Sequence, residues 1–95
     1  MSESARQTRA ERIRSRLQAE LAPLALDLTD ESHLHAGHAG ARPDRGHFRV
    51  RIVAAAFDAL PAIKRHRLIY DALGPLLERD IHALSIEALA PSEVR

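Results

Sequence analysis

The chain has 95 residues, of which 45% are hydrophobic and 28% charged, and its formal net charge is +1. These values are typical of one soluble globular domain over residues 1–95, and they exclude a disordered chain or a strongly acidic or basic one. The absence of cysteine excludes disulfides, zinc sites built on thiolates and a cysteine nucleophile. No apolar run approaches the roughly 18 residues of a membrane span, so we expect no membrane partner.

The N-terminal segment and the absence of cysteine bear on the compartment. A secreted domain of this size usually needs disulfides, and residues 1–17 lack the apolar segment of a secretory signal. We therefore expect a cytoplasmic protein. Residues 1–17 also carry five arginines against two glutamates. Such a charge is typical of a solvated helix face, and it also suits nucleic acid or an acidic partner.

The first half of the chain predicts one helix and two strands. An apolar repeat at spacings of three and four predicts a helix over residues 5–21. Alternating apolar positions predict strands over 24–28 and 47–53. Glycine and proline interrupt residues 33–46 too often for either, so a loop is expected between the strands. The expected inward residues of these strands are Leu24, Leu26, Leu28, Phe48, Val50 and Ile52.

The second half predicts a helix, a break and a last strand. Pro61 suits the first turn of the helix, and Gly74-Pro75 predicts a kink or a break into two short helices. The apolar stripe of this helix is Ile63, His66, Ile69, Tyr70, Leu73, Leu76 and Leu77. Residues 81–89 alternate again and predict a strand. Its expected inward residues are His82, Leu84, Ile86 and Ala88.

Taken in order, these elements indicate an α+β fold. The predicted order is helix, strand, strand, helix (split or kinked) and strand. These elements are sufficient for a two-layer sandwich, with a three-stranded sheet and the helices packed on one face. We found no nucleophile elbow or oxyanion-forming loop near Ser32, although histidines lie close to it in the sequence. We therefore expect no catalytic residues and no enzyme.

Four of the six histidines lie within residues 33–47, as His33, His35, His38 and His47. Imidazole is a common metal ligand, and the spacing of the first three is usable for a mononuclear zinc or nickel site. A loop rich in histidine also binds such metals without a physiological role, so the spacing alone is a weak motif. His82, on an apolar strand face, is by pattern alone typical of a core histidine.

Four blocks of the sequence resemble the BolA family in their order and spacing. They are DES at 30–32, HFRVRIV at 47–53, KRHRLIY at 64–70 and IHALSIEA at 81–88, within a match that runs from about Leu24 to Pro91. The resemblance implies a class II KH-like α+β fold and no enzymatic activity. It also implies a partnership with monothiol glutaredoxins around a bridging [2Fe–2S] cluster, in iron–sulfur trafficking and iron regulation.

The resemblance also implies which histidines bind the cluster. His82 matches the family histidine that opens the last strand and serves as a ligand. The second ligand comes from the region between the first two strands, where His35 and His47 each match a family histidine. Either one is the expected partner of His82, and the additional His33 and His38 make the assignment harder.

The absence of cysteine fits half of a cluster site. A [2Fe–2S] cluster needs four ligands, and imidazole replaces thiolate on one of the irons in Rieske centres. Two histidines of this chain therefore supply ligands for one iron, and a second molecule has to bring thiolates. The resemblance implies that a glutaredoxin cysteine and glutathione bring them. We expect a chain that is monomeric and without cofactor alone, and a heterodimer with the partner.

The basic block KRHR at 64–67 leaves a second function open. Lys64, Arg65 and Arg67 are expected to point outward, toward an acidic partner surface or a phosphate, whereas His66 is expected to anchor the helix through a hydrogen bond. The resemblance favours partner docking, although DNA binding is also associated with BolA proteins. The alternative function is therefore a KH-like nucleic-acid-binding transcriptional regulator. GHAG at 37–40 is similar to a KH-domain GXXG loop but lies between two strands, which argues against RNA binding of the usual KH kind.

Overall fold

A computed structural model of the chain describes residues 8–32 and 46–94. Within them the elements are α1 (Arg9–Leu21), β1 (Ala25–Asp30), β2 (Gly46–Val53), the 3-10 turn η3 (Ala55–Phe57), α2 (Ala62–Leu73), α3 (Leu76–Arg79), β3 (Ile81–Leu89) and the 3-10 turn η4 (Pro91–Glu93). The predicted order of helices and strands is confirmed. Of the loop expected over 33–46, residues 33–45 lie outside the described residues, and Gly46 belongs to β2.

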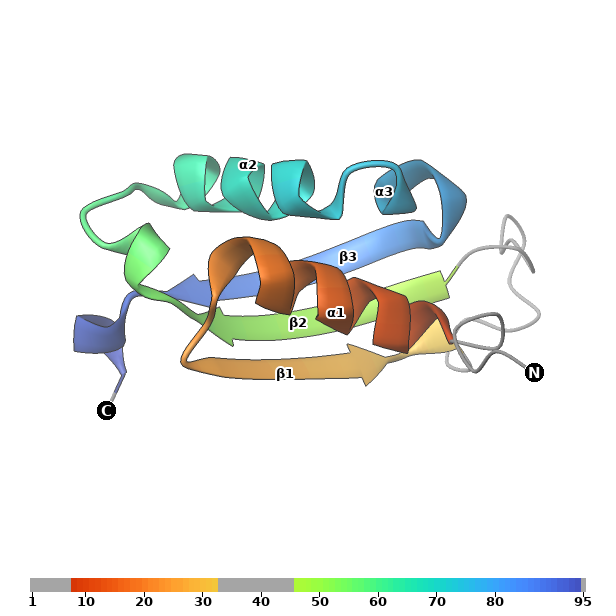
Figure 1. Cartoon of the computed structure of the whole chain (residues 1–95), viewed down its shortest axis with the longest axis horizontal. Coiled ribbons are helices and arrows are strands. Elements are labelled where there is room, and N and C mark those ends of the chain that lie inside the picture. Colours follow the sequence, from red (N-terminus) through yellow and green to blue (C-terminus); the bar gives the residue numbers. More distant parts are fainter. Residues whose placement is uncertain (1–7, 33–45, 95) are drawn as a thin grey trace.

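The three strands form one mixed sheet with β2 in the centre. β1 runs antiparallel to β2, with Leu28 opposite Val50, and β3 runs parallel to β2, with Ile86 opposite Val50. A parallel pair needs a crossover connection, which η3, α2 and α3 provide here. The helices lie together over one face of the sheet (Figure 1). The predicted α+β two-layer architecture is therefore confirmed.

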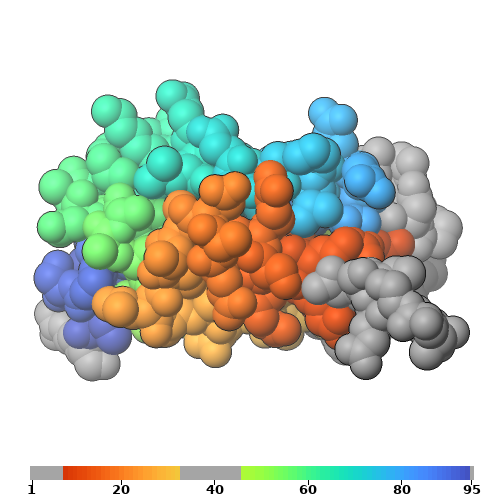
Figure 2. Space-filling view, viewed as in Figure 1, coloured from red at the N-terminus to blue at the C-terminus, as the bar shows by residue number. Residues whose placement is uncertain are grey.

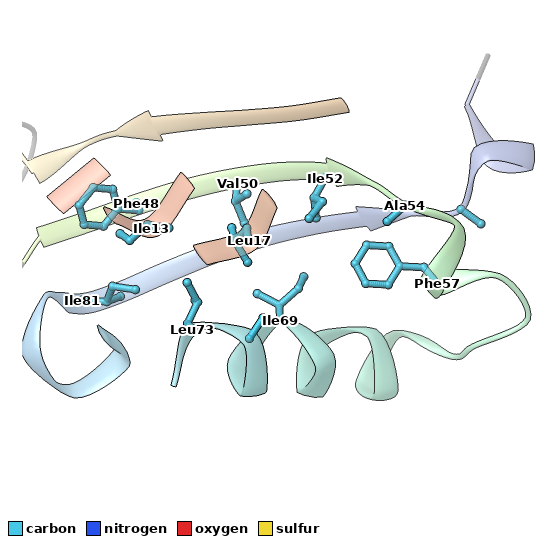
Figure 3. Packing of buried hydrophobic residues seen from close by; sticks show 12 residues of the cluster. Ile13, Leu17, Phe48, Val50, Ile52, Ala54, Phe57, Ile69, Leu73 and Ile81 are labelled. Atoms are coloured by element: carbon cyan, nitrogen blue, oxygen red, sulfur yellow. The ribbon is translucent and has the colours of Figure 1, made fainter. Parts of the chain in front are cut away.

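The core lies between the helices and the sheet (Figure 3). Its largest fully buried side chains are Phe48, Phe57, Ile13, Leu17, Ile52, Ile69, Leu73 and Val50. The inward alternation predicted for β2 is confirmed, since Phe48, Val50 and Ile52 are all buried while Arg49 between them is exposed. α1 closes the layer with Ile13 and Leu17, four residues apart on one helix face.

The buried face of α2 differs from the predicted stripe. Ile63 is 70% exposed and Tyr70 is 42% exposed, whereas Ile69, Ala72 and Leu73 are buried. Ala72 and Leu73 follow Ile69 by three and four positions, so the three buried residues form one narrow helix face, and the rest of the apolar stripe is not fully buried. The prediction for Leu24 is also wrong. This residue precedes β1 and is 72% exposed, not inward.

The predicted break at Gly74-Pro75 is confirmed. Gly74 follows the last residue of α2 with a φ of 54°, in the region that favours glycine, and its N–H donates to the Tyr70 carbonyl over 3.0 Å. Pro75 lacks an N–H to continue the helical ladder and stands at the start of α3. The chain therefore turns from α2 into α3 before it enters β3 (Figure 1).

Arg65 is folded inward, and its predicted outward orientation is wrong. Its side chain is 11% exposed and donates to the carbonyls of Leu60 over 2.7 Å and Ala88 over 3.0 Å, and to the Glu93 carboxylate over 2.5 and 3.1 Å. Glu93 also accepts from the N–H of Ala90. The hydrogen bonds between the two side chains raise the pKa of Arg65 and lower the pKa of Glu93. Arg65 thus ties the start of α2 to the end of β3.

Replacing Glu93 by glutamine is expected to destabilise the fold at neutral pH and to matter less in acid. Folding lowers the Glu93 pKa below its ordinary value of 4.5, so the stabilisation is present above that pH and is lost as the pH falls through the native value. The difference in free energy of unfolding between wild type and Glu93→Gln should therefore shrink below about pH 4.5. Urea unfolding at a series of pH values measures it, and a difference that grows in acid would contradict the contact.

Ile69 and Ile63 form a matched pair for testing the packing of α2. Ile69→Ala is expected to lower the free energy of unfolding by about 2–5 kcal/mol, because it leaves a cavity between the helix and the sheet. Ile63→Ala is expected to change it by no more than about 0.5 kcal/mol, because that side chain is on the surface. Urea unfolding at neutral pH measures both, and equal losses would show that the helix face is assigned wrongly.

Candidate metal-binding site

His47 and His82 lie side by side at one end of the sheet. They stand near the starts of β2 and β3, and parallel strands bring their starts together (Figure 1). The centroids of the two imidazole rings are 4.9 Å apart, and the ring planes are inclined by 54°. The structure thus brings together two of the three histidines that the sequence singles out as cluster ligands.

An extra residue in β3 determines how His82 reaches this position. Gly46 is opposite Ile81 and His47 is opposite Ala83, so His82 is inserted between the paired positions of the two strands. A bulge of this kind redirects the side chains on either side of it. Ile81 is therefore buried and His82 exposed, whereas a regular alternation would place His82 on the inward face with Leu84. The predicted inward face of His82 is wrong.

Hydrogen bonds from two directions fix the start of β2. The N–H of Gly46 donates to the carbonyl of Asp80 over 2.9 Å, and the N–H of His47 donates to Oγ of Ser32 over 3.1 Å. The carbonyl of His47 accepts from the N–H of Glu31 over 2.8 Å. The backbone at His47 is therefore held both by the segment after β1 and by the turn that leads into β3.

Asp80 holds the turn before β3 against α1. It is 8% exposed, and its carboxylate accepts from Arg12 over 3.2 and 3.3 Å, with Arg9 at 3.9 Å. Two of the N-terminal arginines therefore pair within the chain, beside the residues that carry His82. This contact could not be predicted from the sequence, because Arg12 and Asp80 are 68 positions apart and no local pattern relates them.

The spacing of the two rings suits two ligands of one metal ion. An imidazole nitrogen binds a metal at about 2.0 Å, so two imidazoles on one tetrahedral ion have ring centroids on the order of 5 Å apart. The observed separation is 4.9 Å. Within residues 8–32 and 46–94, no group of three or more histidine, aspartate or glutamate side chains could hold a metal. Further histidine or carboxylate ligands would therefore come from residues outside the described part of the chain or from a partner.

One ring nitrogen at this site is enclosed. Nε2 of His47 is buried and receives no hydrogen bond within the described part of the chain. His47 also takes part in other interactions. His82 is exposed, so the pair combines one ring set into the fold with one that faces solvent.

The other histidines and basic residues have different surroundings. His33, His35 and His38 lie outside the described residues, as does GHAG. Lys64 and Arg67 are exposed on α2 as predicted. His66 is half-buried with its ring 6.5 Å from that of Tyr70, edge to face, and its side chain forms no hydrogen bond with the described residues, so its predicted hydrogen-bond anchor is not observed.

A comparison of the chain with models of known protein families agrees with the resemblance seen in the sequence blocks. The BolA-like protein family model matches residues 17–93. The chain belongs to the BolA family. It is 48% identical over 92 residues to SufE-like protein 1, chloroplastic/mitochondrial, of Arabidopsis thaliana, covering 92% of this chain and 25% of that protein. It is 46% identical over 90 residues to Protein BOLA1, chloroplastic, of the same plant, covering 92% of this chain and 56% of that protein.

Solved BolA structures match the fold. The BolA domain of SufE1 from Arabidopsis thaliana has a TM-score of 0.80 at 48% identity, covering 93% of this chain and 98% of that one. BolA1 from the same plant also has a TM-score of 0.80, at 40% identity, covering 94% and 99%. The matched structures thus span the BolA domain, while this chain spans little more than half, or less, of the two curated plant relatives. These relatives are not named as enzymes.

The location of the protein is left open by these comparisons. No helix in the described part of the chain is long and apolar enough to cross a membrane. The names of the two plant relatives place them in chloroplasts or mitochondria. The expected cytoplasmic location of this chain therefore stays a prediction.

Gly46→Ala is expected to disturb the start of β2 and to separate the two rings. A Cβ at this position would lie 2.6 Å from the Phe48 ring and 2.7 Å from Oγ of Ser32, closer than real side-chain contacts. We expect a loss of about 1–3 kcal/mol in the free energy of unfolding, typical of overpacking. Ser32→Ala, which removes only the hydrogen bond to His47, should cost about 1 kcal/mol. Urea unfolding compares them, and an unchanged midpoint for Gly46→Ala would contradict the close packing.

Proposed function

We propose that this BolA protein supplies His82 and His47 as the ligands of one iron in a [2Fe–2S] cluster shared with a monothiol glutaredoxin. The observation that carries the proposal is the 4.9 Å separation of these two rings in a chain without cysteine. The glutaredoxin cysteine and glutathione would bring the thiolates of the other iron. The expected assembly is a heterodimer that serves iron–sulfur trafficking or iron regulation.

The donor set fits half of such a site. Histidine pairs take the place of cysteine on one iron of Rieske clusters, so two imidazoles form a complete ligand set for that iron. A bound cluster supplies an iron–sulfur group that can change its oxidation state. The chain contributes the positions of the ligands, since the hydrogen bonds of Gly46 and Ser32 hold His47, and the bulge turns His82 out of the core beside it.

His47 is favoured over His35 as the partner of His82. His47 is carried by the central strand and its ring is next to His82, whereas His35 lies outside the described residues. His35 matches a histidine position of the family and stays the alternative ligand. A ligand on β2 has the further advantage that the hydrogen bonds of Gly46 and Ser32 fix its backbone.

Visible circular dichroism of a cluster-loaded monothiol glutaredoxin, titrated with this chain, tests the proposal. Wild type should change the spectrum with saturation at one chain per cluster, because each chain offers one pair of histidines. His82→Ala and His47→Ala should each abolish the change by removing one of the two ligands. His66→Ala is the matched control and should behave as wild type, because His66 lies on α2, away from the pair.

Two other results of the titration would contradict the proposal or change the assignment of the second ligand. No spectral change with folded wild-type protein would contradict the cluster role with this partner. Loss of the change in His35→Ala, but not in His47→Ala, would replace His47 by His35. Far-ultraviolet circular dichroism of each variant separates loss of a ligand from loss of the fold.

DNA binding is the second candidate function, because one relative carries that name. The DNA-binding transcriptional regulator BolA of Haemophilus influenzae is 36% identical over 81 residues, covering 76% of that protein. In this chain, exposed Lys64 and Arg67 on α2 would make the phosphate contacts. Fluorescence anisotropy with labelled duplex DNA separates two outcomes. Binding that vanishes near physiological salt would show only the nonspecific phosphate term, whereas sequence-specific binding lost in a Lys64→Gln, Arg67→Gln variant would support a regulator.

A further inference from the structure

A groove of about 390 Å³ lies on the helical side of the molecule, between α1 and the turn that joins α2 to α3. We call it the arginine groove. Figure 2 shows the face on which α1 lies beside these elements. The lining residues, all of them described by the structure, are Arg12, Ser15, Arg16, Leu73, Pro75, Leu76 and Arg79.

The arginine groove combines apolar and cationic surface. Leu73, Pro75 and Leu76 give it carbon surface, and the only ionisable side chains among its described lining residues are arginines. The charge of Arg12 is already matched by Asp80. Arg16 and Arg79 form no ion pair with the described residues, so their two charges are not balanced within that part of the chain.

One of these two arginines, Arg16, lies against the turn at Gly74 and is held there by a hydrogen bond. A Cβ on Gly74 would lie 3.2 Å from a terminal guanidinium nitrogen of Arg16, which therefore rests against the turn between α2 and α3. Nε of Arg16 donates to the carbonyl of Ala72 over 2.9 Å. This bond holds the guanidinium at the groove and leaves its other N–H donors for a second acceptor.

We propose that the arginine groove docks an acidic segment of a protein partner. Carboxylates of that segment would pair with Arg16 and Arg79. Guanidinium suits this role because its planar donors match the two oxygens of a carboxylate. An apolar side chain beside them would cover Leu73, Pro75 and Leu76. Charge complementarity of this kind directs encounter and register, while the apolar contact slows dissociation.

Nucleic acid suits this groove less well than an acidic peptide. A phosphate backbone is bound by a run of cations, and single strands are bound by stacking on aromatic rings. The arginine groove offers two unbalanced cations, no aromatic residue among its described lining, and a carbon surface that phosphates do not use. The proposal goes beyond the cluster role, because the groove contains neither His47 nor His82.

A short synthetic helical peptide, with glutamates on one face and leucines beside them, is the probe. Amide chemical shifts of the isotope-labelled full chain should move at residues 12–16 and 73–79 when the peptide is added. Arg79→Gln and Arg16→Gln should each weaken binding by about tenfold, because each loses one charged contact. A peptide with glutamine in place of glutamate should also bind about tenfold more weakly or worse.

The controls separate docking in the groove from general attraction by charge. Arg67→Gln removes an exposed arginine of α2 that does not line the groove, and it should bind the peptide as wild type does. Arg79 is exposed, so Arg79→Gln keeps the test valid even if Arg16→Gln loses stability with its bond to Ala72. Equal weakening by Arg67→Gln, or no weakening by Arg79→Gln, would overturn the proposal.

The same residues also test two alternative occupants of the arginine groove, which are duplex DNA and a second copy of this chain. Duplex DNA that displaces the peptide and moves the same amide resonances at physiological salt would assign the groove to nucleic acid. Sedimentation that shows a dimer of this chain, lost in Arg79→Gln, would assign it to a second copy. Either result would overturn docking of an acidic partner. A failed glutaredoxin titration would leave the groove proposal standing, because neither histidine lines the groove.

Discussion

The parallel pairing of β2 with β3 is the constraint on which the rest of the structure depends. Parallel neighbours need a crossover, so η3, α2 and α3 must pass over the sheet between them and bury Ile69 and Leu73 there. The same pairing brings the starts of both strands to one end. His47 and His82 meet for that reason, and the register shift between Gly46 and His47 turns His82 outward rather than into the core.

Local patterns in the sequence predicted most of the fold, because they report on one element at a time. The alternation of β2 and the break at Gly74-Pro75 depend on neighbours a few residues away, and both are confirmed. The bulge at His82 depends on where β3 pairs with β2, which no alternation within β3 reveals. The inward side of α2 likewise depends on what covers it, and an apolar stripe that includes Ile63 was therefore too wide.

The candidate site was predicted from family resemblance more than from pattern. By alternation alone, His82 belongs to a core face, and only its match to the BolA histidine marks it as a ligand. The structure adds the proximity of His47, which spacing along the chain does not contain. Contacts between distant residues were the part that sequence reasoning lacked. Two ion pairs show this, one between Arg65 and Glu93 and one between Arg12 and Asp80. Each joins segments that no local pattern relates.

The arginines of α1 show why net charge was a poor guide to function. The surplus near the N-terminus could be counted from the sequence, but its use depends on which carboxylates the fold brings near. Arg12 is matched by buried Asp80 and secures the turn before His82, so its charge serves the structure. Arg16, one turn further along the same helix, is held by a carbonyl that leaves its charge unbalanced within the described chain. These two arginines thus differ because Arg12 reaches the carboxylate of Asp80, whereas Arg16 reaches, among the described residues, only the carbonyl of Ala72.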